Sequence, residues 1–180
     1  MIYLNNYGWN DKLSQLKQES TYNALTHGRI SIVHRTCYEV VSENGLFQCE
    51  LTGNMMYGKS DIELPCTGDW VLFQPFDEHK GIIVDMLPRE RTLYRKKNGT
   101  VADKQAIASY VDKAFIVQSL DDNFNVRRAE RFMVQMQEEN INPVLVFNKA
   151  DLGFDEQKVE EQIRHIARQI PVFFTSIHQP

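Results

Sequence analysis

The fold of this chain is indicated most clearly by one stretch, Pro143-Val144-Leu145-Val146-Phe147-Asn148-Lys149-Ala150-Asp151. Its first five residues form an unbroken apolar run, which is typical of a parallel strand covered by helices on both faces. The run leads directly into the tetrad Asn-Lys-x-Asp. In open α/β sheets, ligands bind in the crevice beyond the carboxyl ends of the strands, so the tetrad is expected at a ligand site.

The side chains of the tetrad suit a guanine base. The carboxylate of Asp151 offers two acceptor oxygens, and guanine presents a ring N–H and an exocyclic amino group on one edge. Adenine lacks that pair of donors, so a buried carboxylate would discriminate strongly against it. Asn148 can bond the other edge of the base, and Lys149 can lay its aliphatic stem along the ring. An ordinary polar loop after a strand is the alternative interpretation.

The composition narrows the class of protein. The 180 residues, 42% of them apolar, suffice for one domain or two small ones. A net charge of −4 excludes a whole-chain attraction to nucleic acid but allows a local basic patch. The three cysteines lack C-x-x-C spacing, the histidines lack metal-like spacing, and neither a membrane-length apolar run nor a signal pattern occurs. These features predict a cytoplasmic protein without a metal site or a membrane partner.

Residues 25–95 alternate apolar and polar side chains, with breaks at Gly, Asn and Pro. This pattern predicts a small antiparallel barrel of five strands, the strand count of the OB-fold, which commonly binds oligonucleotides. The predicted strands are 29–33 leading into 38–41, then 47–51, 69–73, 81–84 and 92–94. Residues 1–24 are predicted to be an extension whose Trp9, Leu13 and Leu16 pack on the residues after it. A barrel used only for protein docking is the alternative.

A basic segment follows the barrel. Residues 89–104 hold six basic residues against two acidic ones, a surplus of four positive charges in a chain that is negative overall. Such a surplus is the electrostatic footprint of binding to a phosphate backbone. The candidate RNA contacts are Arg89, Arg91, Arg95, Lys96 and Lys97. The alternative is a solvated linker without specific contacts, and residues 96–108 are assigned to this basic linker.

The pattern changes again over residues 109–180. Buried-strand runs at 114–117, 143–147 and 171–174 alternate with two amphipathic helical patterns, one capped by Asn125 and one beginning near Asp155. This alternation predicts right-handed crossovers and a parallel sheet. Three strands make a thin α/β sheet, so this part is interpreted as an incomplete, truncated half-domain. The predicted fold class is α+β with two domains, a five-stranded OB-like barrel followed by the α/β half-domain.

A second motif, Gly53-Asn54-Met55-Met56-Tyr57-Gly58-Lys59-Ser60, matches the phosphate-loop pattern G-x-x-x-x-G-K-S. A working phosphate loop follows a buried strand and opens a helix. Here the preceding strand pattern alternates, and Pro65 and Gly68 leave no room for a following helix. The stretch is therefore interpreted as a loop between barrel strands, with Lys59 exposed.

The order of parts, a barrel followed by the guanine-recognition end of an α/β sheet, resembles the ribosome small-subunit-dependent GTPase A family (RsgA, also called YjeQ). Members of this family carry their GTPase motifs in circularly permuted order. The resemblance spans most of the chain and rests on the order and spacing of four motifs. These are Pro65-Cys66-Thr67-Gly68-Asp69-Trp70-Val71, Leu87-Pro88-Arg89-Glu90-Arg91, Gln105-Ala106-Ile107-Ala108-Ser109-Tyr110-Val111-Asp112 and Asn148-Lys149-Ala150-Asp151-Leu152.

The resemblance implies the N-terminal part of a circularly permuted, P-loop NTPase-like GTPase. It implies guanine-binding roles for Asn148, Lys149 and Asp151, and for Ser176, although Ile177 stands where the family has Ala. It implies GTP or GDP with Mg²⁺ as cofactors of the full-length protein, and zinc only in a C-terminal domain outside these residues. No catalytic residue is expected in this chain, which alone is expected to be inactive because the family's phosphate loop comes later.

The partner implied by the resemblance is the small ribosomal subunit, contacted through its rRNA by the barrel of a monomeric assembly factor. A different function fits the same residues. A stand-alone OB-type RNA- or ribosome-binding module, without nucleotide chemistry, is the alternative.

Overall fold

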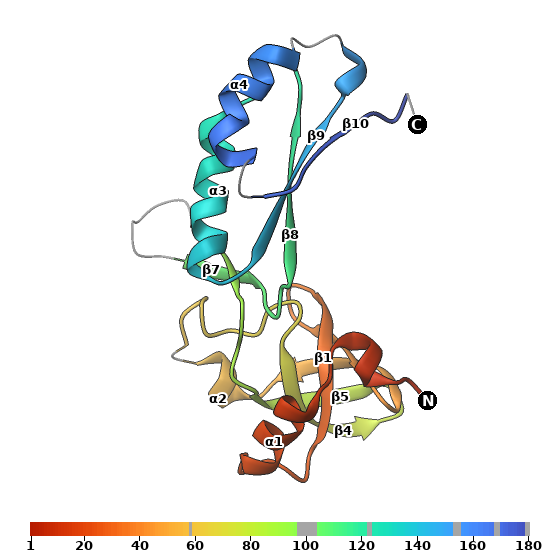
Figure 1. Ribbon diagram of the computed structural model, residues 1–180. Helices are drawn as coiled ribbons and strands as arrows, with labels where there is room; N and C mark the ends of the chain where they lie inside the picture. Colours follow the sequence, from red (N-terminus) through yellow and green to blue (C-terminus); the bar gives the residue numbers. More distant parts are fainter. Residues whose placement is uncertain (58, 97–103, 122–123, 153–155, 168–169, 179–180) are drawn as a thin grey trace. The chain divides into compact units, whose positions relative to one another are not determined.

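Five strands close into a barrel in the N-terminal part of the computed structural model (Figure 1). They are β1 (Thr26–Val33), β2 (Tyr38–Ser42), β3 (Gly45–Leu51), β4 (Trp70–Asp77) and β5 (Lys80–Met86). Their order around the barrel is β1-β2-β3-β5-β4, in which β4 returns to pair antiparallel with β1 and β3 pairs parallel with β5. The predicted five-stranded, OB-like barrel is confirmed.

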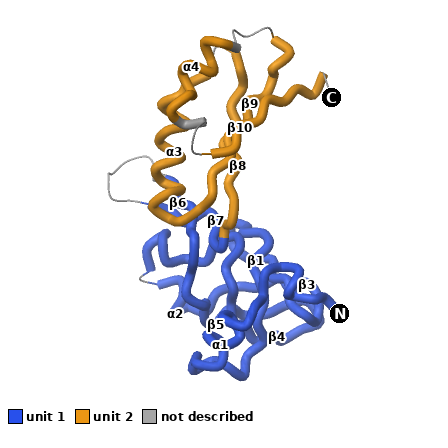
Figure 2. Tube along the Cα trace, viewed as in Figure 1, with its two compact units in different colours: residues 1–110 blue, residues 111–180 orange. Residues whose placement is uncertain are grey.

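The structure describes residues 1–57, 59–96, 104–121, 124–152, 156–167 and 170–178. The chain divides into two compact units, Met1–Tyr110 and Val111–Pro180 (Figure 2). No helix among the described residues combines the length and the apolar character that crossing a membrane requires.

The predicted membership of the barrel was wrong at one strand. Residues 29–33 and 38–41 belong to two antiparallel strands, because the chain turns where the His34 N–H donates to the Cys37 carbonyl over 2.8 Å. The predicted strand 92–94 lies outside the barrel, as part of β6 (Leu93–Lys96), which pairs antiparallel with β7 (Lys104–Ala108). Part of the predicted linker 96–108 is therefore a strand, and residues 97–103 lie outside the described residues.

The barrel is filled by the inward-facing residues of its alternating strands. The buried cluster consists of Ile30, Tyr38, Val40, Phe47, Cys49, Met55, Val71, Phe73 and Ile83. A second cluster joins the N-terminal segment to the outside of the barrel, because Leu4 and Leu13 are buried with Trp70 and Leu72. Leu4 opens the short helix η1 (Leu4–Tyr7), and Leu13 lies in α1 (Asp11–Glu19), whose first turn is capped by the Asn10 side chain.

The phosphate-loop match has a structural explanation. Its first four residues form the single helical turn α2 (Gly53–Met56), and the side chain of Met55 enters the barrel core with 4% exposure. No helix follows Lys59, which is exposed, in the described residues up to β4. A phosphate loop needs its helix after the lysine, so this turn serves the packing of the barrel.

The second unit is a parallel sheet with two helices. Its elements are β8 (Lys113–Ser119), α3 (Val126–Glu138), β9 (Asn142–Asn148), the short helix η2 (Ala150–Leu152), α4 (Glu156–Ala167) and β10 (Val172–Thr175). The strand order is β10-β9-β8, with both pairings parallel, as predicted. Both helices lie on one side of the sheet, which buries Ala129, Met133 and Ile163 (Figure 1).

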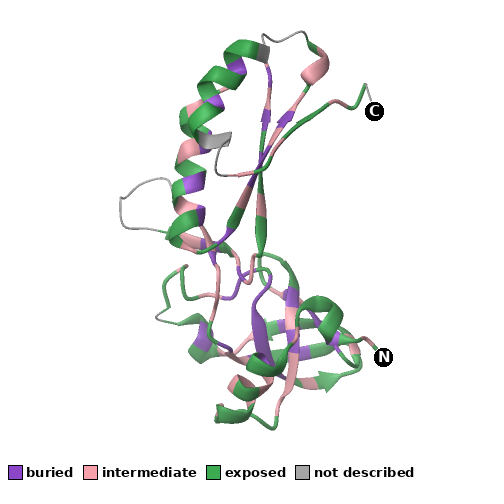
Figure 3. Ribbon diagram, in the orientation of Figure 1, coloured by how far each residue is buried: buried purple, intermediate pink, exposed green. Residues whose placement is uncertain are grey.

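The expectation that helices cover both faces was wrong for the described residues. On the face opposite the helices, Phe115 is 65%, Val117 61% and Phe173 55% exposed, and Figure 3 shows exposed stretches along the strands of this sheet. These residues lie on one side because side chains alternate along each strand and the register pairs Val117 with Val146 and Val146 with Phe173. On the same face, Val146 of the central strand β9 is only partly exposed because a strand lies on each edge. Three other residues of β9 are buried, namely Val144, Leu145 and Phe147.

The backbone at Gly68 admits no side chain. Its φ is +95°, and a Cβ built there would lie 2.3 Å from the carbonyl oxygen of Ser109. Gly68→Ala is therefore expected to lower the free energy of unfolding by roughly 3 kcal/mol or more, as measured by urea denaturation. Gly45→Ala is the matched control, since Gly45 also has a positive φ but has no atom within 4 Å of such a Cβ. An equal loss in both variants would contradict the close approach at Gly68.

Candidate functional site

Asn148 ties together the carboxyl ends of the three parallel strands. It is the last residue of β9 and is paired in register with Ser119 of β8 and Thr175 of β10. The Thr175 hydroxyl donates to the Asn148 side-chain oxygen over 3.3 Å, and the Leu120 N–H donates to its main-chain carbonyl over 2.9 Å. Asn148 thus links both neighbouring strand ends.

Lys149 leaves the strand in an unusual conformation. Its φ is +62°, in the left-handed region that residues with a Cβ rarely adopt. Its carbonyl accepts the Leu152 N–H over 3.1 Å, which closes the turn of η2. Its ammonium pairs with the Asp121 carboxylate over 2.7 Å, so the side chain reaches from the end of β9 toward the end of β8.

Asp151 is held from the opposite side of the sheet edge. The Ser176 hydroxyl, just beyond β10, donates to Oδ1 of Asp151 over 2.5 Å, and the Ser176 oxygen in turn accepts the His178 N–H over 3.0 Å. This hydrogen bond is the main reason that the pKa of Asp151 lies below its ordinary value, with further contributions from His178 and Lys149. The carboxylate is therefore ionised at neutral pH and available as an acceptor.

The four residues predicted for the site lie around the carboxyl ends of adjacent parallel strands. The structure adds three that sequence reasoning missed: Ser119, Asp121 and Thr175. A usable signal existed, because Ser119 and Asp121 follow the apolar run of β8 and the ends of parallel strands meet at one edge. A shallow hollow along α3, lined by Asn125, Arg127, Arg128 and Val134 among others, contains none of these residues.

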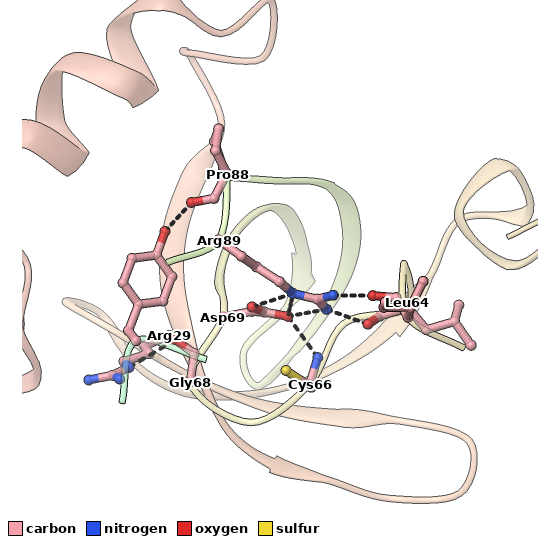
Figure 4. Close-up of polar contacts among 9 residues, drawn as sticks. Arg29, Leu64, Cys66, Gly68, Asp69, Pro88 and Arg89 are labelled. Carbon is pink, nitrogen blue, oxygen red and sulfur yellow. Dashed lines mark hydrogen bonds and ion pairs between the residues drawn. The ribbon is translucent and has the colours of Figure 1, made fainter. Parts of the chain in front are cut away.

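Arg89, predicted to contact RNA, is hydrogen-bonded within the barrel unit. Its guanidinium donates to both carboxylate oxygens of Asp69, over 2.9 and 2.7 Å, and to the carbonyls of Ile62 and Leu64 (Figure 4). Asp69 is fully buried and also accepts the Cys66 N–H over 2.7 Å. The arginine side chain is 13% exposed, so its donors are directed inward and away from a phosphate backbone.

The other predicted RNA contacts are arranged differently. Arg91 has a φ of +44° and pairs with Glu90 over 3.4 Å, with 33% of its side chain exposed. Arg95 is exposed on β6, where Lys104 of β7 lies over the ring of Tyr94 at 5.8 Å. Lys96 ends β6, and Lys97 lies outside the described residues. The described residues hold no group of three His, Cys, Asp or Glu side chains suited to a metal ion.

Solved structures with this architecture are known. YloQ, described as a circularly permuted GTPase, matches 89% of this chain and 54% of its own with a TM-score of 0.56 and 22% identity. YjeQ from Thermotoga maritima matches 84% of this chain and 51% of its own with a TM-score of 0.61 and 24% identity. The chain, with its closed barrel followed by a parallel α/β sheet, thus shares the fold of these solved structures.

Sequence relatives give the family. The model of the RsgA GTPase family matches residues 86–180. Small ribosomal subunit biogenesis GTPase RsgA 1 of Bacteroides thetaiotaomicron is 72% identical over 97% of this chain and 49% of its own length. The RsgA of Methanosarcina acetivorans is 33% identical over 92% of this chain and 44% of its own length. This chain belongs to the RsgA GTPase family, and it spans about half the length of the curated relatives it matches.

The structural role of Arg89 can be tested by substitution. Arg89→Ala would leave the Asp69 carboxylate buried without its ion-pair partner, which is expected to lower the free energy of unfolding by about 3–5 kcal/mol in urea denaturation. Arg95→Ala, at an exposed position, is expected to change it by less than about 0.5 kcal/mol. Stability unaffected by Arg89→Ala would contradict the assignment of this side chain to the barrel.

Proposed function

We propose that this chain carries the guanine-recognising and RNA-contacting parts of a GTPase that acts in assembly of the small ribosomal subunit. Family membership supports this proposal, as do relatives whose names state small ribosomal subunit biogenesis. The chain spans about half of those relatives, so the activity proposed is that of the longer protein.

The observation that carries the proposal is the position of the Asp151 carboxylate, which accepts the Ser176 hydroxyl at the carboxyl end of a parallel strand. In this role one oxygen accepts the ring N–H of guanine and the other accepts its amino group. Asn148 holds the strand ends together, and Lys149 lays its stem along the ring. Adenine lacks the paired donors, so it would add no partner to the carboxylate beyond the Ser176 hydroxyl, which is the source of discrimination against adenine.

We assign GTP hydrolysis to residues of the longer protein other than those that the structure describes. We assign no catalytic residue, Mg²⁺ ligand or zinc ligand to the described residues, and we expect no GTP hydrolysis by this chain alone. GTP or GDP with Mg²⁺ is the proposed cofactor of the longer protein, in which the metal stabilises charge on the transferred phosphoryl group. The proposed setting is a monomer in the cytoplasm.

For the barrel unit we propose contact with ribosomal RNA through Arg91, Arg95, Lys96 and Lys97. The exposed Arg95 and the basic surplus of residues 89–104 support this role. Arg89 is left out because its donors are bonded within the barrel. Docking on a ribosomal protein is the competing use of the same barrel.

Asp151→Asn tests the base contact, in the longest product of the reading frame that contains this chain. The amide would place a donor opposite the amino group of guanine, so we expect binding of a fluorescent GDP analogue to weaken at least tenfold. Binding of the xanthine analogue, which has an oxygen there, should strengthen. Lys59→Ala is the control and should leave both affinities unchanged. Unaltered GDP affinity of Asp151→Asn would refute the role of Asp151.

Salt dependence tests the RNA contact. We expect four basic side chains each to neutralise a phosphate. A plot of the logarithm of the association constant for small subunits against the logarithm of the salt concentration should then have a slope of about −3. Arg95→Ala should make that slope shallower by about 1, whereas Lys113→Ala, which removes an exposed charge from the start of β8, should leave it unchanged. Co-sedimentation indifferent to salt would favour docking on protein.

A further inference from the structure

The left-handed backbone of Lys149 needs an explanation. A residue with a Cβ held at a φ of +62° carries a conformational cost, and such positions persist where the surroundings fix them. Here the turn bond from the Leu152 N–H to the Lys149 carbonyl fixes one side of the residue. The far end of the side chain is fixed by its ammonium, which donates to the Asp121 carboxylate over 2.7 Å. The stem of Lys149 is therefore held at both ends.

Asp121 is itself held in place. Its Oδ1 accepts the Ser119 hydroxyl over 2.8 Å, while its Oδ2 pairs with Lys149. Its side chain is 22% exposed, compared with 50% for Lys149. An exposed pair between two freely moving side chains contributes little. This pair differs, because one partner is hydrogen-bonded to the end of β8 and the other is fixed by its backbone.

We propose that Asp121 is a positioning residue of the guanine site, which holds the ammonium of Lys149 so that the stem of Lys149 forms one wall for the base. This inference rests on the function proposed above. Asp121 acts through Lys149 and touches no reacting atom. The site then draws on all three strands, with Ser119 at the end of β8 and Asp121 after it, Lys149 and Asp151 after β9, and Ser176 after β10.

The charges of this group orient the nucleotide. Two carboxylates, Asp121 and Asp151, flank one ammonium, so the group has a net charge of −1. A negative site attracts the N–H-bearing edge of a neutral base and repels a phosphate. We therefore expect the phosphates of a bound nucleotide to lie away from the Asp121–Lys149 pair.

A double-mutant cycle tests the positioning role in the longest product of the reading frame. Asp121→Ala and Lys149→Ala are each expected to weaken binding of a fluorescent GDP analogue, by about two- to fivefold for Asp121→Ala. The double variant should bind no more weakly than Lys149→Ala alone, since Asp121 acts only through Lys149. Asp121→Asn, which keeps the size of the side chain, should reproduce the loss with an unchanged melting temperature.

The sign of the effect separates positioning from bulk charge. Removing a negative charge should strengthen binding of an anionic nucleotide if charge alone mattered, so weaker binding by Asp121→Ala supports positioning. Glu161→Ala, which removes an exposed charge from α4, is the matched control and should not weaken binding.

Two results would overturn the inference, and they differ. Additive losses in the double variant, or no loss in Asp121→Asn, would overturn the role of Asp121 while guanine binding by the unmodified protein stands. If the unmodified protein does not prefer guanine to adenine nucleotides, the proposed function fails, and the role of Asp121 fails with it.

Discussion

The parallel register of β8, β9 and β10 is the constraint on which the candidate site depends. Ser119, Asn148 and Thr175 are register partners, so the loops after all three strands begin at the same edge of the sheet. Parallel strands end together in this way because their crossover helices return each strand to the same starting edge. The side-chain contacts between strand ends then join neighbouring strands, with Asp121 meeting Lys149 on one side and Ser176 meeting Asp151 on the other.

The barrel unit depends on a different interaction, the buried pair of Asp69 and Arg89. Removing two charges from water is costly, and here the cost is offset by bidentate geometry, the Cys66 N–H and two main-chain carbonyls. The motif Gly68-Asp69-Trp70 thereby acquires a structural explanation. Gly68 lies against the Ser109 backbone, Asp69 anchors Arg89, and Trp70 packs with the N-terminal segment. The residues of this motif are therefore explained by the architecture of the barrel, without a binding partner.

The two lysine-bearing motifs show why local pattern needs context. Residues 53–60 match the sequence pattern of a phosphate loop, yet their helical turn precedes the lysine and places Met55 in the barrel core. Residues 148–151 begin at the end of a strand whose neighbours run parallel on both edges, so their side chains meet partners from the ends of β8 and β10. The strand before each motif distinguishes the two cases, because an alternating strand belongs to a barrel and an apolar one to an α/β sheet.

The sequence by itself determined the barrel, the parallel α/β unit and the edge where Asn148, Lys149 and Asp151 lie, because side-chain periodicity encodes strand type and strand ends encode the edge. It misassigned residues 92–94 to the barrel, because period two does not say which strand is the partner. It also gave no sign that Arg89 pairs with Asp69, because a charge does not say which carboxylate lies nearby. Tertiary structure alone decided that Asp121 meets Lys149 and Ser176 meets Asp151. Those contacts join residues 28 and 25 positions apart, and only the strand register sets such distances.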